Sequence, residues 1–155
     1  MTRPPGRHLP YNPADTVYAE ARMSELLVPI SPGELIDKIT ILEIKSERMT
    51  DATKLANVRT ELELLMATWN ASPYARTDIA DDWRALRGVN EKLWVIEDDI
   101  RDKERASAFD AVFIDLARAV YVTNDERAAI KKRINTRLGS RLVEEKSYAE
   151  YRSPA

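Results

Sequence analysis

The sequence contains no cysteine and only one histidine. The lack of cysteine excludes disulfide bonds, thiolate nucleophiles and zinc sites built from cysteine ligands. The single histidine, His8, lies among prolines near the N-terminus, so we expect neither a serine–histidine–aspartate triad nor a histidine-ligated metal. Any metal ion would have to be a hard cation held by carboxylates. We therefore predict no metal and no cofactor.

Glycine and long apolar runs are also scarce. The chain has four glycines, and none stands in a phosphate-binding loop such as G-x-G-x-x-G or G-x-x-x-x-G-K. It has no apolar run of about 18 residues, and its N-terminus lacks the apolar core of a secretory signal. We expect no membrane span and a cytoplasmic location.

What the chain does contain is typical of one globular domain. Its 155 residues are 44% hydrophobic and 32% charged, with a formal net charge of −2. A protein that neutralises nucleic-acid phosphates is usually more basic, so nucleic acid is not an expected partner. Residues 1–22 hold four of the eight prolines and no hydrophobic periodicity. We expect a flexible leader over 1–22, with Met23 as an alternative start, and a single helical domain over 23–155.

Hydrophobic spacing predicts helices and no clear strand pair. Ser31-Pro32-Gly33-Glu34 is the best start signal, because Ser31 can cap the N3 amide, Pro32 suits the first helical position and Glu34 completes a capping box. We expect the segment 24–30 to lie extended across the bundle. The predicted helices cover about 32–49, 52–70, 79–105, a fourth helix around 109–120, and a fifth from the Thr123–Glu126 capping box to about 138.

The predicted fold is therefore an all-α bundle of four to five helices with an antiparallel N-terminal helical hairpin and a docked C-terminal tail. The helix at 32–49 has two apolar faces, and the next helix carries an apolar seam of coiled-coil type. Either surface could pair with another chain. One hypothesis is therefore that the protein forms a homo-oligomer through the helix of residues 32–49.

A first polar cluster follows the apolar seam of the helix at 79–105. Asn90, Trp94, Glu97 and Arg101 are spaced by four, three and four residues, so they share one stripe. Trp94 offers a flat wall for a ring or a sugar, and Glu97 with Arg101 would be partly desolvated. The alternative is a surface ion pair beside a core tryptophan. Nearby Glu97-Asp98-Asp99, Asp102 and Glu104 are interpreted as a solvated acidic face rather than a magnesium site.

A second polar cluster follows the predicted break at Thr123. Asn124, Arg127, Lys131 and Asn135 continue the line of the preceding apolar stripe, and six cations occur between Arg127 and Arg141 without an acid. A helix N-terminus at Asn124 would add free amides and a positive dipole end, which favours a phosphate or carboxylate. The alternative is that these cations pair with acids elsewhere, notably on the helix at 79–105.

Two further segments are interpreted structurally. Glu144-Glu145-Lys146-Ser147-Tyr148 could close over a site, but docking of the tail onto the bundle is favoured. Ser31, Asp37 and Lys38 stand at a helix N-terminus, where anions can bind. Because Glu34 already serves that helix end, we assign these residues a structural role.

From about Met23 to Tyr151 the chain resembles an uncharacterised bacterial family known only as a domain of unknown function. The resemblance rests on five stretches: the 28–43 stretch VPISPGELIDKITILE, the 89–94 stretch VNEKLW, the Asn124–Arg127 turn, Ile134-Asn135, and the 144–148 stretch EEKSY. It implies a bacterial protein, with a leader outside the family pattern. It implies no activity, cofactor or catalytic residue.

These patterns together predict a polar cleft that binds a small anionic molecule, walled by Trp94. Its predicted ligand-binding residues are Asn90, Trp94, Glu97, Arg101, Asn124, Arg127, Lys131 and Asn135. A protein–protein interaction module or homo-oligomeric scaffold without catalysis is the main alternative. The second alternative is a helical enzyme that acts on a phosphorylated or carboxylated metabolite. It ranks last because no residue spacing identifies a nucleophile or a general base.

Overall fold

The computed structural model describes residues 25–149 and 151, and all regular structure within them is helical. Helix α2 spans Pro32–Arg48, α3 spans Ala52–Ala71, the short 3-10 helix η1 spans Pro73–Arg76, α4 spans Ala80–Arg105 and α5 spans Ala111–Arg137. The predicted all-α fold is therefore confirmed. The leader predicted over residues 1–22 lies outside the described residues.

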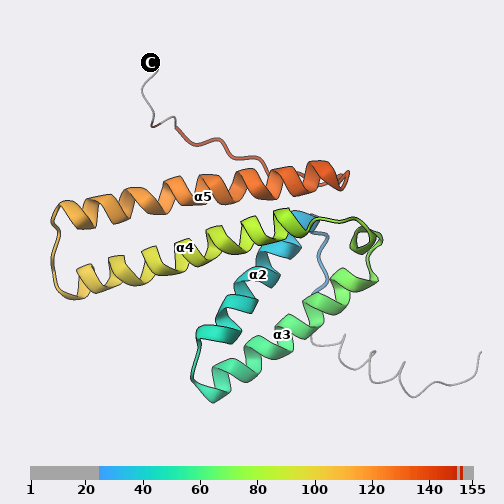
Figure 1. Ribbon diagram of the computed structural model, residues 1–155, viewed down its shortest axis with the longest axis horizontal. Coiled ribbons are helices and arrows are strands. Elements are labelled where there is room, and N and C mark those ends of the chain that lie inside the picture. Colours follow the sequence, from blue (N-terminus) through green and yellow to red (C-terminus); the bar gives the residue numbers. More distant parts are fainter. Residues whose placement is uncertain (1–24, 150, 152–155) are drawn as a thin grey trace, which may run out of the picture.

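The helices form two pairs that meet at one end (Figure 1). Helices α4 and α5 run antiparallel as a long pair, and α2 and α3 form a shorter pair that opens like a V. The shorter pair packs against the end of the long pair where α4 begins and α5 ends. The opposite end, at the turn between α4 and α5, projects beyond α2 and α3. We call residues 97–120 the projecting end.

Short polar side chains begin most of the helices. Ser31 Oγ accepts a hydrogen bond from the Glu34 N–H at 3.2 Å, and Asp51 and Asp110 make the same contact at the starts of α3 and α5. Such caps each contribute about 1 kcal/mol. At the start of α4, Asp78 Oδ1 accepts from the Ala80 N–H at 3.0 Å. These positions agree with the predicted starts near residues 32, 52 and 79.

The predicted break at Thr123 is wrong, because α5 runs without interruption through it. A residue begins a helix only when its own backbone is non-helical, and nothing in this segment stops the preceding helix, which contains neither glycine nor proline. Thr123 is instead buried inside the helix pair. Asn124 Nδ2 donates to the Val120 carbonyl at 3.0 Å, four residues back in the same helix. There is therefore no helix N-terminus at Asn124 to attract an anion.

The hydrophobic core fills the junction between the two helix pairs. It consists of Leu35, Ile36, Ile39, Trp69, Ile79, Leu86, Val89 and Ile134. Trp69 and Trp83 meet edge to face inside it, with ring centroids 5.7 Å apart. Both apolar faces of α2 are covered within the chain, since Ile36, Ile39 and Ile44 are all buried. The two-faced pattern of α2 thus has an explanation within one chain.

The first turn of α2 packs unusually close to α5. The Gly33 N–H donates to Asn135 Oδ1 at 2.8 Å, and both residues are buried. A Cβ at Gly33 would lie 2.7 Å from the Lys131 carbonyl oxygen and 2.9 Å from Asn135 Oδ1. Because the first of these atoms belongs to a helix backbone, it cannot rotate away. Only glycine fits between the helices at this point.

We expect Gly33→Ala to lower the free energy of unfolding by about 1–3 kcal/mol, because the added methyl group forces α2 and α5 apart. Gly88→Ala is the matched control. Gly88 is exposed in the middle of α4, and a Cβ there meets nothing within 4 Å. Its replacement should raise stability by about 0.5–1 kcal/mol through helix propensity. Urea denaturation measures both variants, and a Gly33→Ala protein as stable as the wild type would contradict the close contact.

Candidate functional site

A cleft of about 510 Å³ lies between α2, α4 and α5, and we call it the central cleft. Helix α2 contributes Ile41 and Lys45, while Leu93 and Asp98 come from α4. Six of the residues predicted from the sequence also line it: Asn90, Trp94, Glu97, Arg101, Asn124 and Arg127. The predicted polar stripes of the third helix and of the segment after Thr123 therefore face the same space.

The other two predicted residues, Lys131 and Asn135, do not line the central cleft. Both are buried farther along α5, against the first turn of α2. Their side chains contact protein groups there. The sequence pattern placed them on the correct helix, but the position of α2 decides what they contact.

Trp94 forms an aromatic wall of the central cleft and already has one cationic neighbour. The Arg48 guanidinium carbon lies 6.0 Å from the centroid of the indole ring. Beyond Trp94, Arg101 forms a close ion pair with the Glu97 carboxylate and also donates to the Glu97 carbonyl at 2.7 Å. The side chains of Arg101 and Glu97 are 65% and 42% exposed, so this pair is a surface ion pair rather than a desolvated one.

Two asparagines bring amide groups to the cleft in a fixed orientation. Asn90 Nδ2 donates to Asp37 Oδ1 at 2.8 Å and to Thr40 Oγ1 at 3.1 Å. Asn124 Nδ2 donates to the Val120 carbonyl. Because the amide nitrogens are engaged by protein acceptors, the amide oxygens of Asn90 and Asn124 are the groups that can accept a hydrogen bond from a ligand hydroxyl or amine.

Lys45 and Arg127 are the other two basic groups of the cleft, and Arg127 adds to the effect of Lys131 and Lys146 in holding the pKa of the Glu144 carboxyl below its usual value. Among the described residues, neither forms a salt bridge, whereas the third basic lining residue, Arg101, is paired with Glu97. Lys45 stands on α2 and Arg127 on α5, so they approach the cleft from two different helices. Lys45 did not belong to the polar stripes identified in the sequence.

The remaining cations near the end of α5 mostly pair with acids, as the alternative interpretation of that segment expected. Arg133 Nε and Arg137 bind the two oxygens of buried Asp82 on α4, at 2.7 and 3.2 Å. Burial raises the pKa of Asp82, but the two guanidinium groups outweigh it and hold that pKa below its usual range. Lys132 binds Glu145 at 3.2 Å. These contacts fasten α5 to α4 and to the following segment.

Lys131 lies at the centre of a buried polar group that we call the lysine cluster. Its ammonium contacts Glu34 at 2.6 Å, Glu144 at 2.7 Å and Asp37 at 3.9 Å, and the Lys131 side chain is only 8% exposed. Burial lowers the pKa of Lys131, but hydrogen bonds to Glu144 and Glu34 outweigh this effect and raise the pKa above its usual value. Lys131 therefore stays charged at neutral pH and joins α5, α2 and the segment after α5. The Glu34 carboxylate serves this contact rather than the predicted capping box.

The lysine cluster is connected to the central cleft through Asp37 and Asn90. Asp37 is buried, faces Lys131 through one carboxylate oxygen and accepts the Asn90 hydrogen bond through the other. Asn90 in turn lines the cleft. The orientation of at least one cleft residue is thus set by the buried charges behind it.

Two buried polar atoms on α5, Thr123 Oγ1 and Asn135 Nδ2, have no hydrogen-bond partner among the residues that the structure describes. Asn135 uses its oxygen to hold the Gly33 N–H, so the close approach of the two helices leaves its nitrogen unpaired. Thr123 is 1% exposed within the helix pair. Unpaired buried groups of this kind cost stability and are uncommon in folded proteins.

The segment after α5 docks on the bundle through its charged residues. Glu144 and Glu145 bind Lys131 and Lys132, and the rings of Tyr121 and Tyr151 meet edge to face with centroids 4.9 Å apart. Tyr148 in this segment is 78% exposed. This segment covers a separate cavity of about 660 Å³, whose lining includes Asn124 and Arg127. These two residues therefore separate it from the central cleft.

The acidic run on α4 is mostly exposed, as the interpretation of a solvated acidic face expected. Asp98, Asp99, Asp102 and Glu104 are exposed, and Glu97 is half-buried. Within residues 25–149 and 151, no three acidic or histidine side chains are placed to hold a metal ion. No helix in the same residues is long and apolar enough to cross a membrane.

Sequence reasoning missed Glu34, Asp37, Thr40 and Lys45 as partners of the site. Asp37 could have been identified from the sequence, because this acidic residue stands among the apolar residues Leu35, Ile36 and Ile39 that predict a buried helix face. An acidic group on a buried helix face needs a cation or a donor. The sequence could not identify that donor, since Asn90 and Lys131 lie far away along the chain.

We expect Glu144→Gln to lower the free energy of unfolding at pH 7 by about 1 kcal/mol, because a nearly half-exposed charge-assisted hydrogen bond is lost. The hydrogen bond from Lys131 holds the pKa of Glu144 below its ordinary 4.5. The stabilisation is therefore present above that pH and is lost as the pH falls through the depressed pKa.

Urea titrations at pH values above and below 4.5 measure the difference between variant and wild type, which should shrink as the pH is lowered. Glu145→Gln is the matched control, since Glu145 and its partner Lys132 are both exposed and their pair contributes little. A difference between Glu144→Gln and wild type that stays constant with pH would show that the charge is not involved.

Comparison with known proteins agrees with the resemblance seen in the sequence. The family model of DUF6165, a family of unknown function, matches residues 26–154. No curated protein and no solved structure matches the chain. The matched range includes helices α2 to α5, the central cleft and the lysine cluster. The chain therefore belongs to DUF6165, a family of unknown function.

Proposed function

We propose that the central cleft binds a small anionic molecule. The observation that carries the proposal is the placement of Arg127 and Lys45 on two helices around one cleft, with neither side chain in a salt bridge among the described residues. A basic group without a carboxylate partner at a concave site favours an anionic ligand. The lining holds three basic side chains and two acidic ones, so its net charge is positive.

The rest of the lining supports a ligand with a ring and hydrogen-bond donors. The Trp94 indole offers a flat surface, and the amide oxygens of Asn90 and Asn124 can accept hydrogen bonds from hydroxyl or amine groups. A volume of about 510 Å³ lies within the range of small-molecule sites. A phosphorylated sugar or a related carboxylated metabolite combines these properties.

The proposal is for binding and not for a reaction. The cleft has Glu97 and Asp98 as its acidic groups, and Glu97 is already paired with Arg101. Neither carboxylate lies beside a nucleophile that it could activate. An enzyme acting on a phosphorylated or carboxylated metabolite would use the same cleft. The identity of the ligand therefore bears on both binding and catalysis.

We expect at least one phosphorylated or dicarboxylate compound to raise the melting temperature of the full chain in a thermal-shift panel of nucleotides, nucleotide sugars, sugar phosphates and dicarboxylates. A ligand present at about 100 times its dissociation constant stabilises by about 2.7 kcal/mol, which corresponds to several degrees. Arg127→Gln should abolish the shift.

Arg118→Gln is the matched control for Arg127. Arg118 lies on the same helix, is exposed and lines no described cavity, so its replacement should leave the shift unchanged. A panel without any shift, or a shift that survives in Arg127→Gln, would contradict the proposed site.

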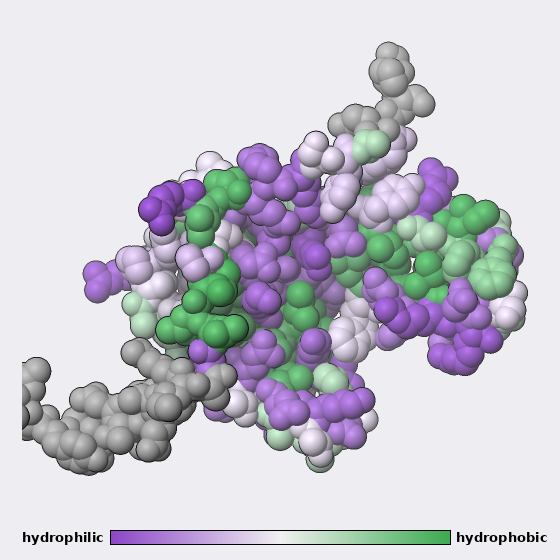
Figure 2. Space-filling view, turned by 180° about the vertical axis from the view of Figure 1, so that it is seen from behind, coloured by the Kyte–Doolittle hydropathy of each residue, from purple (hydrophilic) through white to green (hydrophobic). Residues whose placement is uncertain are grey.

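Self-association through the projecting end is a second candidate, and exposed apolar side chains favour it. Phe109, Val112 and Ile114 are between 52% and 60% exposed. Figure 2 shows apolar surface on this part of the helix pair, away from α2 and α3. Exposed apolar clusters commonly mark interfaces. Because α2 is buried within the chain, this surface fits a homo-oligomer better than the helix of residues 32–49.

If this candidate holds, light scattering should detect a dimer or larger species whose population rises with protein concentration. Ile114→Glu should shift the protein to a monomer, because it places a charge within the apolar surface. Leu64→Glu, at an exposed leucine on α3, is the control and should not change the oligomeric state. A strict monomer at high concentration would exclude this candidate.

A further inference from the structure

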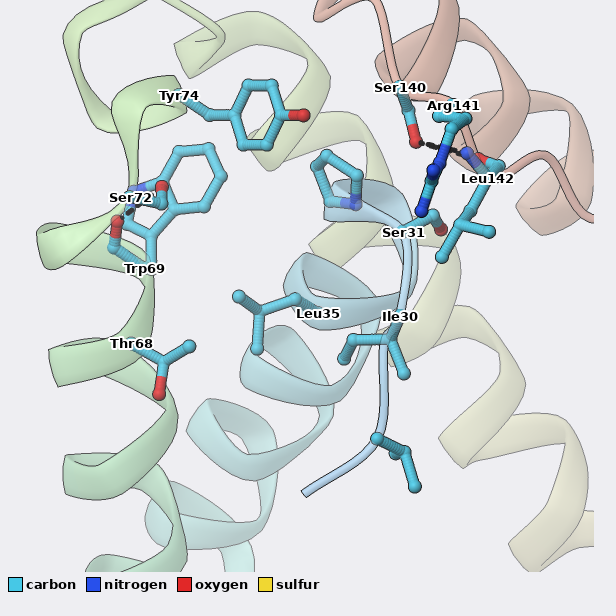
Figure 3. A pocket seen from close by; sticks show the side chains of 12 residues that line it. Ile30, Ser31, Leu35, Thr68, Trp69, Ser72, Tyr74, Ser140, Arg141 and Leu142 are labelled. Atoms are coloured by element: carbon cyan, nitrogen blue, oxygen red, sulfur yellow. Dashed lines mark hydrogen bonds between the residues drawn. The ribbon is translucent and has the colours of Figure 1, made fainter.

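A separate cavity of about 370 Å³ lies on another part of the molecule, away from the lining of the central cleft. Three segments enclose it: residues 28–35 at the start of α2, residues 68–74 at the end of α3 and η1, and residues 140–142 after α5 (Figure 3). The two cavities share no lining residue. They are therefore two distinct cavities.

Seven of the twelve residues that line this cavity are apolar or aromatic. Its lining includes the side chains of Val28, Ile30, Pro32, Leu35, Trp69, Tyr74 and Leu142. Figure 3 shows Trp69 and Tyr74 on one side and Ile30 with Leu142 on the other, with Leu35 between them. Such a lining favours an apolar body with little hydrogen-bonding capacity.

Three of the hydroxyl groups around the cavity are already engaged as donors. Thr68 Oγ1 donates to the Leu64 carbonyl at 3.0 Å, and Ser72 Oγ donates to the Trp69 carbonyl at 2.7 Å. Ser140 Oγ donates to the Leu142 carbonyl at 2.7 Å. A polar ligand would therefore find few donors inside this cavity.

One charged group stands at the edge of this apolar space. Arg141 is the only charged lining residue, and it forms no salt bridge within the described part of the chain. In Figure 3 it lies beside Ser31, on the side opposite Trp69 and Tyr74. Ser31 Oγ accepts from the Glu34 N–H, so its own proton can be donated to an anion. The two residues together offer a charged and a neutral donor.

We propose that this cavity binds a monocarboxylate with an alkyl chain. The carboxylate would bind Arg141 and Ser31, and the chain would extend over Leu35 toward Trp69 and Tyr74. Arg141, a cation without a salt bridge among the described residues, complements the carboxylate, and the mostly apolar space complements the alkyl chain.

Tryptophan fluorescence of the full chain tests both binding and orientation, because Trp69 lines the cavity. We expect 8-bromooctanoate, whose bromine is at the chain end, to quench the fluorescence saturably. The isomer 2-bromooctanoate places its bromine beside the carboxylate and should bind but quench less. Calorimetry with octanoate, decanoate and octan-1-ol separates the contribution of the carboxylate from that of the chain.

Arg141→Gln should weaken octanoate binding about tenfold and leave the weak binding of octan-1-ol unchanged, since only the carboxylate uses the guanidinium. Arg76→Gln is the matched control, because Arg76 is exposed on η1 and does not line the cavity. Circular dichroism establishes that both variants are folded. The proposal is overturned by non-saturable quenching, by equal quenching with the two bromo isomers, or by unchanged octanoate affinity in Arg141→Gln.

Discussion

The arrangement of this protein depends on the ion contacts of one buried lysine. Lys131 is nearly excluded from water, and a charge in that position needs compensating carboxylates. Glu34 and Asp37 supply them from the first turns of α2, and Glu144 supplies another from the segment after α5. Three parts of the chain are therefore held at one point. The adjacent Gly33–Asn135 hydrogen bond brings the helix backbones close enough for these contacts to form.

This anchor also determines the shape of the central cleft. Asp37 faces Lys131 through one carboxylate oxygen and Asn90 through the other, so this carboxylate links the lysine cluster to the cleft. Helix α2 is fixed relative to both α4 and α5 by these contacts, and Lys45 is carried into the cleft from its later turns. The floor of the cleft is thus rigid and hydrogen-bonded, whereas Arg127 and Arg101 at its edges are more accessible. That combination is suitable for binding a ligand with a fixed orientation.

The two ends of the long helix pair differ in how they are stabilised. Near α2 and α3, the apolar residues Leu86, Val89 and Ile134 are fully or almost fully buried. In the projecting end, Ile100, Phe113 and Leu116 are only partly buried, and several neighbours are exposed. The central cleft lies where the covered part of the pair gives way to the projecting end. A partner bound to that end would therefore lie next to the cleft.

The sequence by itself determined the helices, their approximate limits and most of the cleft lining. Helical spacing alone placed Asn90, Trp94, Glu97 and Arg101 on one stripe, because residues three and four apart share a face. Spacing could not show that α5 continues through Thr123, since a capping motif also occurs inside helices when nothing stops the preceding turn. It also could not separate Lys131 from Arg127, which are one helical turn apart. Only the tertiary structure decided that Lys131 meets three carboxylates and Arg127 meets the cleft, because those neighbours come from distant segments that packing alone brings together.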